Sequence, residues 1–307
     1  MKYPYMRKSF DHENSGFIIS IIGITLTISM FTLWLLAFII LYYGSMITKT
    51  IIVLIYIYQI LIADKNPLYI KFYTYCNLNG YFKSYTLIVE EELHKDKVLL
   101  CTHPHGIISL GMGSAIFHQN SILKNFIICG TRFVRFLPIS GIIARWIGIQ
   151  GVNHQNFKKF MNEGKNIVFV PGGFECATFT NHRKDRVFLK NRKGFIKYAL
   201  RYGYKVYPCY NFNENKLYYT FNGFETIMYY LNKFKIPGCF FVGKFFFFPR
   251  TDIDICTVIG KPLELPVIAN PSKDEVDKYH LSYMNNLINL YNRYKSEFGC
   301  SETLEII

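Results

Sequence analysis

Uncharged, apolar positions dominate the start of the chain. Residues 15–48 contain no charged side chain, and after Lys49 a second uncharged run covers residues 50–63. A helix needs about 20 apolar residues to cross a bilayer, and Phe17–Tyr43 exceeds that length. The pattern therefore predicts either a hairpin of two helices that turns near residues 44–49, or one long span followed by a buried or interfacial helix.

The flanks of this apolar region are basic on both sides. The basic residues are Lys2, Arg7 and Lys8 before it and Lys65, Lys71 and Lys83 after it. By the positive-inside rule, a hairpin places both flanks in the cytosol. A signal peptide is disfavoured for two reasons. The apolar part of a signal peptide spans only about 7–15 residues, which is shorter than this run, and no small-residue cleavage site follows the run here. We therefore predict a cytosolic N-terminal segment (1–15), a transmembrane hairpin (16–63) and a membrane-associated domain (64–307).

Beyond residue 63, short apolar runs alternate with amphipathic stretches. The runs are rich in β-branched and aromatic residues, which is typical of buried strands. The predicted strands are Lys97–Cys101, Phe126–Cys129, Asn166–Val170, Lys205–Tyr210 and Asp254–Ile259. Two stretches with helical periodicity, Arg192–Tyr202 and Lys273–Phe298, each end at a glycine. This alternation predicts an α/β fold with a mixed, largely parallel sheet and flanking helices.

The aromatic run Phe245–Phe248 has two interpretations. A buried core strand is one. The other is a loop that dips into lipid, because Pro249 follows the run and Lys244 and Arg250 flank it.

Composition narrows the class of partner. The chain has 307 residues, half of them apolar, and a net charge of +14. Nucleic acid, an anionic membrane and a polyanionic molecule such as coenzyme A all suit that charge. The aromatic residues lie in apolar runs rather than between basic residues, which disfavours nucleic acid. The eight cysteines show neither a CxxC pair nor zinc spacing, so we expect reduced thiols and no metal site.

Two histidines follow the first predicted strand of the domain. They belong to the sequence His103-Pro104-His105-Gly106. Ligands of open α/β sheets bind at the carboxyl ends of the strands, and an imidazole can take a proton from an attacking alcohol. Pro104 restricts His103 to an extended backbone, and Gly106 leaves room beside His105. These features favour His105 as the general base and His103 as a residue that shapes the pocket.

A second motif follows the strand that ends near residue 170. Pro171, Gly172 and Gly173 form a turn whose backbone N–H groups are suited to an oxyanion or a phosphate. Glu175 comes directly after and is a candidate to orient a catalytic histidine. An ordinary tight turn is the alternative interpretation.

Basic residues are dense between residues 183 and 201. Arg192, Lys193 and Gly194 stand where the predicted helix begins, and the N-terminus of a helix together with basic side chains binds phosphate groups well. A solvated helix face is the alternative interpretation.

These motifs, in this order, resemble the type-2 diacylglycerol acyltransferase family, which also contains monoacylglycerol and wax-alcohol acyltransferases. The residues that carry the resemblance are His103–Gly106, Pro171–Glu175, Asn191–Phe195, Ala199–Gly203 and the tail Tyr279–Glu302. The resemblance covers roughly residues 80–307, and the N-terminal hairpin is similar too.

The resemblance implies an acyl-CoA-dependent O-acyltransferase of the endoplasmic reticulum membrane and the lipid-droplet surface, with its catalytic domain facing the cytosol. Its partners would be acyl-CoA as co-substrate, diacylglycerol or a related acceptor lipid, the membrane and, as an open alternative, a second copy in a homo-oligomer. No cofactor, metal or nucleic acid is expected. His105, His103 and Glu175 are the predicted catalytic residues. The predicted substrate-binding residues are Gly106, Pro171, Gly172, Gly173, Arg192, Lys193, Gly194, Asn211 and Glu214.

The sequence departs from the family pattern at several positions. The wider glycerolipid acyltransferase superfamily has an aspartate five positions after its histidine, where this chain has Ile108 or Leu110; Glu175 is therefore the candidate partner. Lys83 stands where relatives often have proline, and Asn213 where they usually have glycine. The segment Val152–His154 stands where relatives commonly have a Ser-Arg pair.

Two other classes remain as alternatives: a non-catalytic membrane protein that binds lipids, and a membrane-tethered nucleic-acid binder. The intact His105 and Glu175 disfavour the first, and the lack of a recognisable binding module disfavours the second.

Overall fold

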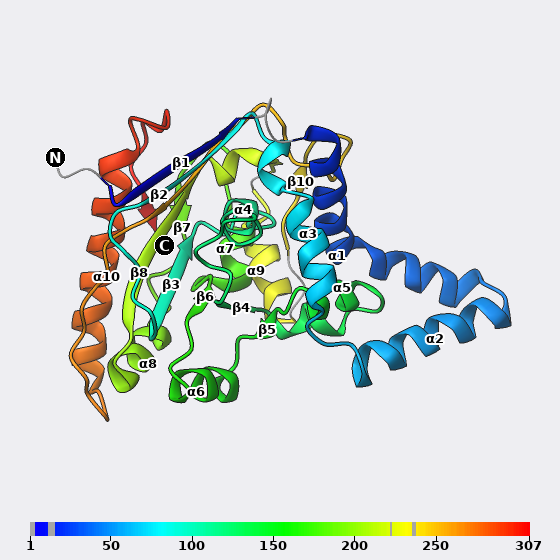
Figure 1. Cartoon of the computed structure of the whole chain (residues 1–307), viewed down its shortest axis with the longest axis horizontal. Helices are drawn as coiled ribbons and strands as arrows, with labels where there is room; N and C mark the ends of the chain where they lie inside the picture. The colour runs from blue at the N-terminus through cyan, green and yellow to red at the C-terminus, as the bar shows by residue number, and fades with distance from the viewer. Residues whose placement is uncertain (1–3, 12–15, 222, 235–237) are drawn as a thin grey trace.

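A computed structural model describes residues 4–11, 16–221, 223–234 and 238–307. Its centre is an eight-stranded sheet with the order β1-β2-β11-β8-β3-β6-β4-β5 (Figure 1). The strands are β1 (Met6–Asp11), β2 (Ser84–Val89), β3 (Val98–His103), β4 (Ile127–Gly130), β5 (Gln150–Gly151), β6 (Ile167–Phe169), β8 (Lys205–Phe212) and β11 (Asp254–Ile259). The pairs β1–β2 and β11–β8 are antiparallel. The pairs β2–β11, β8–β3, β3–β6, β6–β4 and β4–β5 are parallel.

Helices cover both faces of this sheet. The helices are α1 (Phe17–Tyr43), α2 (Met46–Leu61), α3 (Pro67–Tyr75), α4 (Leu110–Ile116), α5 (Ser140–Trp146), α6 (His154–Asn162), α7 (Gly173–Thr178), α8 (Gly194–Tyr202), α9 (Glu225–Lys233) and α10 (Lys273–Tyr294). In β3, Val98 and Leu100 pack in the cluster that contains α1 and α4 residues, whereas Leu99 and Cys101 pack in the cluster that contains α6, α8 and α10 residues. Because both faces of the strand are buried, its sequence is a continuous apolar run.

The predicted α/β class is confirmed, and the predicted strands all form with ends shifted by at most two residues. Strand β3 continues to His103, so the first histidine belongs to the strand itself. Helix α8 begins at Gly194 rather than Arg192, and α10 ends at Tyr294 rather than Phe298. A capping box at Ser272 and Glu275 starts α10.

Strand β1, which precedes α1 in the chain, belongs to the same body as the domain. Strand β1 lies at the edge of the sheet, antiparallel to β2, with Met6 opposite Val89. The chain thus leaves this body through α1 and returns to it through α2 and α3.

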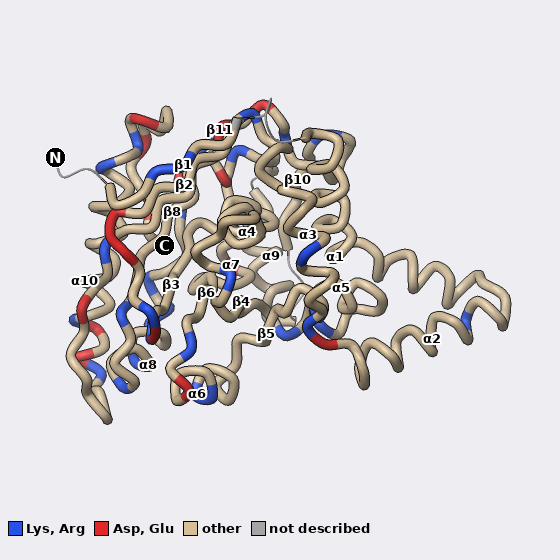
Figure 2. Tube along the Cα trace, in the orientation of Figure 1, with Lys and Arg blue, Asp and Glu red and all other residues tan. Residues whose placement is uncertain are grey.

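Helices α1 and α2 meet at a tight turn. Ser45 caps α2 by accepting the Thr48 N–H at 3.3 Å, and a Cβ at Gly44 would collide with the Ile40 carbonyl. We call residues 35–55, on both sides of this turn, the apolar arm; it projects from the body (Figure 1). Lys49 is its only charged residue (Figure 2).

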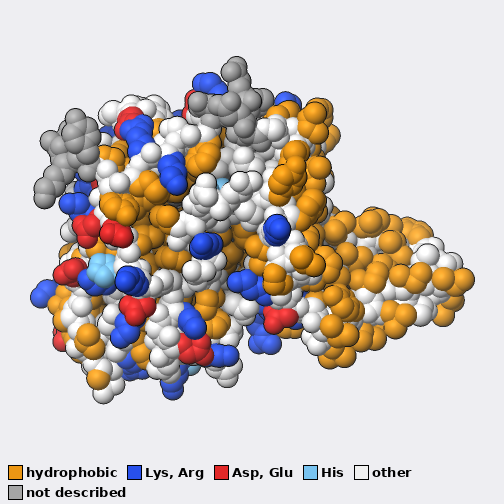
Figure 3. Space-filling model, viewed as in Figure 1, with side chains coloured by type: hydrophobic (Ala, Val, Ile, Leu, Met, Phe, Trp, Pro, Cys, Tyr) orange, Lys and Arg blue, Asp and Glu red, His pale blue; other side chains and the backbone are white. Residues whose placement is uncertain are grey.

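The surface of the apolar arm is mostly hydrophobic (Figure 3). The first half of α1 instead packs on the body through Ile24, Ile28 and Met30. Among the residues that the structure describes, α1 is the one helix long and apolar enough to cross a membrane. The 16-residue α2 is shorter than that.

The aromatic run near residue 245 forms a surface loop. Phe245 and Phe246 have positive φ angles of 49° and 70°, and their side chains are exposed. A phenylalanine seldom adopts this backbone conformation. The core-strand interpretation is therefore wrong for Phe245–Phe247, while Phe248 packs against the core.

Candidate functional site

The two histidines lie at the carboxyl end of β3, between β8 and β6, and the peptide bond between His103 and Pro104 is cis. His103 is fully buried. Its Nε2 lies 2.9 Å from the hydroxyl of Tyr283 on α10. Its Nδ1 is buried and has no hydrogen-bond partner among the described residues. Burial lowers the pKa of His103 to about 3, so this imidazole stays neutral at physiological pH.

His105 is partly exposed and has a different bonding pattern. Its Nδ1 lies 3.1 Å from the Gly106 carbonyl oxygen. A carbonyl only accepts, so Nδ1 carries the proton and Nε2 of the neutral ring keeps a free lone pair. Burial lowers the pKa of His105 as well, which keeps that lone pair available near neutral pH. His105 has the features of a general base.

Glu214 holds the loop that follows His105. Its carboxylate accepts the N–H groups of Leu110 at 2.7 Å and Gly111 at 2.6 Å, at the start of α4. Gly106 has a φ of +60°, and a Cβ there would lie 2.7 Å from Cγ of Glu214. Only glycine fits this close approach. Burial raises the pKa of Glu214 to about 7, although the two backbone hydrogen bonds oppose this shift.

Asn211 is bonded to neighbouring strands. Its amide donates to the Thr102 hydroxyl at 2.8 Å and accepts from the Thr257 hydroxyl at 2.9 Å. Asn211 and Glu214, both predicted to bind substrate, are buried and bonded to protein groups. These contacts give both residues a positioning role beneath the histidine loop.

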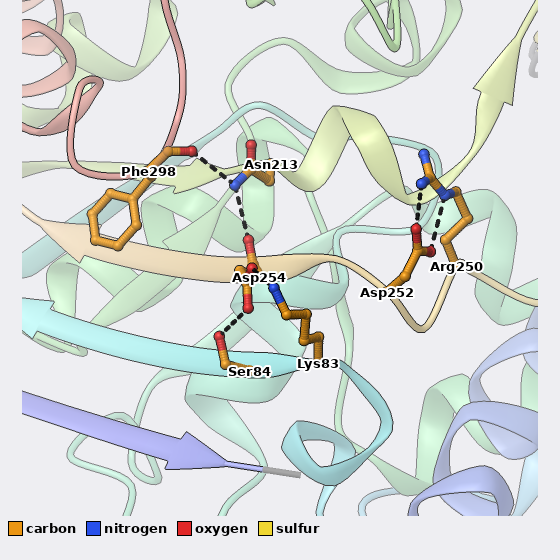
Figure 4. A network of polar contacts seen from close by, with 7 residues as sticks. All are labelled: Lys83, Ser84, Asn213, Arg250, Asp252, Asp254 and Phe298. Atoms are coloured by element: carbon orange, nitrogen blue, oxygen red, sulfur yellow. Dashed lines mark hydrogen bonds and ion pairs between the residues drawn. The ribbon is translucent and has the colours of Figure 1, made fainter.

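Two departures from the family pattern have a local explanation (Figure 4). Asn213 adopts a φ of +64°, which asparagine tolerates better than most residues other than glycine. Its side-chain amide donates to the carbonyls of Asp254 at 2.9 Å and Phe298 at 3.2 Å. Lys83 forms an exposed ion pair with Asp254 at 2.8 Å.

The glycine turn lies next to the histidine loop. Gly173 has a φ of +60°, and a Cβ at Gly172 would collide with Cys176 and the Phe188 carbonyl. The hydroxyl of Thr180, just after α7, donates to the Gly106 carbonyl at 3.2 Å. The structure thus brings the His103–Gly106 and Pro171–Gly173 motifs together, as strands that end at one sheet edge should.

Glu175 forms an ion pair with Arg192. The predicted partner of Glu175 was the imidazole of His105, and no hydrogen bond between these two side chains occurs among the described residues. The ionic partner of Glu175 is instead the Arg192 guanidinium, whose central carbon lies 5.3 Å from the centre of the Phe188 ring. Glu175 therefore connects the glycine turn to the basic loop.

A pocket of about 380 Å³ opens beside this ion pair. Its lining comes from segments 152–157, 169–171 and 191–198, and it includes Pro171, Arg192, Lys193 and Gly194. In the part of the chain that the structure describes, no side chain caps the N-terminus of α8 at Lys193, and a Cβ added at Gly194 would meet no atom within 4 Å. The pocket thus combines basic side chains with uncapped helical N–H groups, an arrangement suited to phosphate.

Sequence reasoning missed several residues of the site. Tyr283 lies within the predicted helix Lys273–Phe298, where nothing in the sequence indicates that its hydroxyl contacts His103. His154 and Tyr198 line the pocket and contact each other through a ring nitrogen and a hydroxyl. The segment with His154 was noted only as a departure from the family pattern. No local pattern marks Tyr283 or Tyr198, because their partners come from distant segments.

Comparisons with known proteins agree on one family. Residues 38–307 match the family model described as diacylglycerol acyltransferase. The chain is 30% identical to human diacylglycerol O-acyltransferase 2-like protein 6 over 255 residues, which cover 74% of this chain and 75% of that protein. It is 31% identical to mouse diacylglycerol O-acyltransferase 2 over 251 residues, covering 73% of this chain and 64% of that protein. The match thus spans less than two thirds of the mouse enzyme.

Two further similarities are more limited. Mouse acyl-CoA wax alcohol acyltransferase 2 is 34% identical over 156 residues, which cover 47% of this chain and 46% of that protein. The crystal structure of the 1-acyl-sn-glycerophosphate acyltransferase PlsC from Thermotoga maritima aligns over 90% of this chain and 97% of that one. Its TM-score is 0.43 and its sequence identity 13%.

Proposed function

The chain belongs to the diacylglycerol acyltransferase family, and we propose that it transfers a fatty acyl group from coenzyme A to the free hydroxyl of diacylglycerol, forming triacylglycerol. The observation that carries this proposal is the contact of His105 Nδ1 with the Gly106 carbonyl, which leaves the Nε2 lone pair for an incoming hydroxyl. A basic pocket lined by Pro171 and Arg192 supports it.

In the proposed reaction, His105 Nε2 takes the proton of the acceptor hydroxyl as its oxygen attacks the thioester carbonyl. A C–O bond forms, and the carbonyl oxygen becomes an oxyanion. The N–H of Gly173 already donates to the Val170 carbonyl at 3.3 Å, so we assign the N–H of Gly172 to the oxyanion. The C–S bond then breaks, and protonated His105 returns its proton to the coenzyme A thiolate.

The acceptor is tested directly by product analysis. Microsomes from cells that express the chain are given labelled oleoyl-CoA with diacylglycerol, monoacylglycerol or a long-chain alcohol, and the products are separated by chromatography. We expect labelled triacylglycerol to predominate. A predominant diacylglycerol or wax ester would identify one of the alternative acceptors, and no labelled ester with any acceptor would favour a non-catalytic lipid-binding protein.

We expect charge removal at Arg192 and Lys193 to raise the KM for acyl-CoA with little change in acceptor dependence. Both cations are held in partly exposed ion pairs, with Glu175 and Asp277. Such pairs are weak and can exchange for coenzyme A phosphates. Steady-state kinetics of Arg192→Gln and Lys193→Gln test this. Arg293→Gln is the control, because it also breaks an ion pair, with Glu90, but lies outside the pocket lining. An unchanged KM in correctly folded variants would contradict the assignment.

We further propose that the apolar arm inserts into the endoplasmic reticulum membrane from the cytosolic side, where the domain then lies, and that the protein reaches lipid droplets. Strand β1, before the arm, pairs with β2, after it. This pairing supports the proposal that both flanks of the arm lie on the same side of the membrane. Protease added to sealed microsomes should therefore remove tags at either end of the chain. Protection of one tag alone would indicate a single crossing.

A further inference from the structure

Three arginines gather where the apolar arm joins the body. Arg132 and Arg135 lie on the short 3-10 helix Arg132–Phe136, and Arg145 lies on α5. Figure 2 shows basic residues at the base of the arm. The segment that carries the arginines binds α2 directly, because the Gln59 amide donates to the carbonyls of Arg135 at 3.1 Å and Leu137 at 3.0 Å.

These arginines are held by neutral groups. The guanidinium carbons of Arg132 and Arg145 lie 5.1 Å and 5.6 Å from the centre of the Phe136 ring. Arg145 donates to the carbonyls of Arg135 at 3.2 Å and Ala63 at 3.4 Å, and Arg135 donates to the Ile149 carbonyl. Within the described part of the chain, no ion pair involves any of the three arginines.

Burial makes this arrangement costly without an anion. Arg145 is only 8% exposed, and a buried charge without a counter-charge is strongly unfavourable. Burial lowers the pKa of Arg135, and the neighbouring Arg145 and Arg132 lower it further, while Asp64 acts in the opposite direction. Lys65 adds a positive charge near Arg145. The aliphatic part of the Lys65 side chain packs on Gly148, and the Gly148 N–H donates to the Arg145 carbonyl.

The position of the cluster indicates where its anion comes from. Trp34 and Tyr56 contact the same segment, through Ser140 and the Phe136 carbonyl. From Trp34 to the end of α1 at Tyr43, nine residues of helix rise about 14 Å. Half the hydrocarbon thickness of a bilayer is about 15 Å. With the arm inserted, its tip reaches the middle of the bilayer, and the arginines lie at the level of the lipid phosphates.

We propose that Arg132, Arg135, Arg145 and Lys65 form a binding site for the phosphate of a membrane phospholipid at the base of the apolar arm. A phosphate oxygen accepts from several guanidinium N–H groups at once, and it supplies the counter-charge that this cluster lacks. The aromatic residues Trp34 and Tyr56 lie at the depth where such side chains favour the membrane interface. The proposal rests on the membrane insertion of the arm and is independent of acyl transfer.

The test uses the full-length protein in a neutral detergent, titrated with phosphatidic acid while its melting temperature is recorded. A ligand that binds the folded state raises the melting temperature. We expect a rise for the native protein and for Arg293→Gln. Arg132→Gln and Lys65→Gln should need about tenfold more lipid for the same rise, because each loses one charge-assisted contact. Both positions are exposed, so these variants should fold.

Two further measurements distinguish other ligands. Inorganic phosphate at the same concentration should leave the melting temperature unchanged, and an equal rise would identify a site for free phosphate instead. The KM of Arg132→Gln for acyl-CoA should match that of the native protein; a higher KM would assign the cluster to coenzyme A. Equal lipid responses in the native protein and in Arg132→Gln would also overturn the proposal.

Discussion

His105→Ala should lower turnover by about 10²–10⁴, roughly 3–5 kcal/mol of activation free energy. The substitution removes the Nε2 lone pair that the Nδ1 contact with Gly106 leaves free. Expression and membrane association should be retained, because the side chain is partly exposed. Turnover with saturating oleoyl-CoA and diacylglycerol in purified proteoliposomes is the direct measurement.

Variants of the neighbouring residues make this result specific. His103→Ala should lose less turnover, because the buried, neutral His103 does not serve as the base. Tyr283→Phe removes the hydroxyl that lies 2.9 Å from His103 Nε2, and it should lower turnover by about as much as His103→Ala does. Glu175→Gln, which breaks the ion pair with Arg192, should lose an intermediate amount of turnover. Near-normal turnover in His105→Ala with a large loss in His103→Ala would reverse the roles of the two histidines, and near-normal turnover in both would rule out the proposed mechanism.

Glu214→Ala should destabilise the protein by roughly 2–6 kcal/mol and abolish most turnover. It leaves the buried N–H groups of Leu110 and Gly111 without an acceptor, at about 1–3 kcal/mol each, and it removes the side chain that packs on Gly106. Thermal unfolding in detergent measures the loss of stability. A melting temperature equal to that of the native protein would contradict this role.

The pH dependence of Glu214→Gln provides a second measurement. The pKa of Glu214 is raised to about 7 from an ordinary value of 4.5, so the folded state holds the proton more tightly than the unfolded chain. Stability from this group is fully present below pH 4.5 and is lost as the pH rises to about 7. Relative to Glu214→Gln, the native protein should lose about 3 kcal/mol over this range. Glu264→Gln, at an exposed carboxylate, should leave the pH dependence unchanged.

The sequence alone determined the elements and the edge of the sheet where the chemistry lies. A strand that is covered on both faces appears in the sequence as a short apolar run. The apolar runs predicted β3, β6 and β11 for this reason. The histidine and glycine motifs follow β3 and β6, and the carboxyl ends of these parallel strands meet at one edge. The uncharged run from residue 15 likewise predicted the apolar region that forms α1 and α2.

Only the tertiary structure decided which partner each polar group takes. Tyr283 reaches His103 from 180 residues away, and Glu214 reaches the start of α4 from over 100 residues away. Glu175 turns to Arg192 because the basic loop folds beside the glycine turn, and Arg145 comes against Arg135 where α5 packs on the base of the arm. The spacing of apolar residues along the sequence indicates which side of a helix or strand is buried. The identity of the group across the interface depends on how distant segments pack, which no local pattern contains.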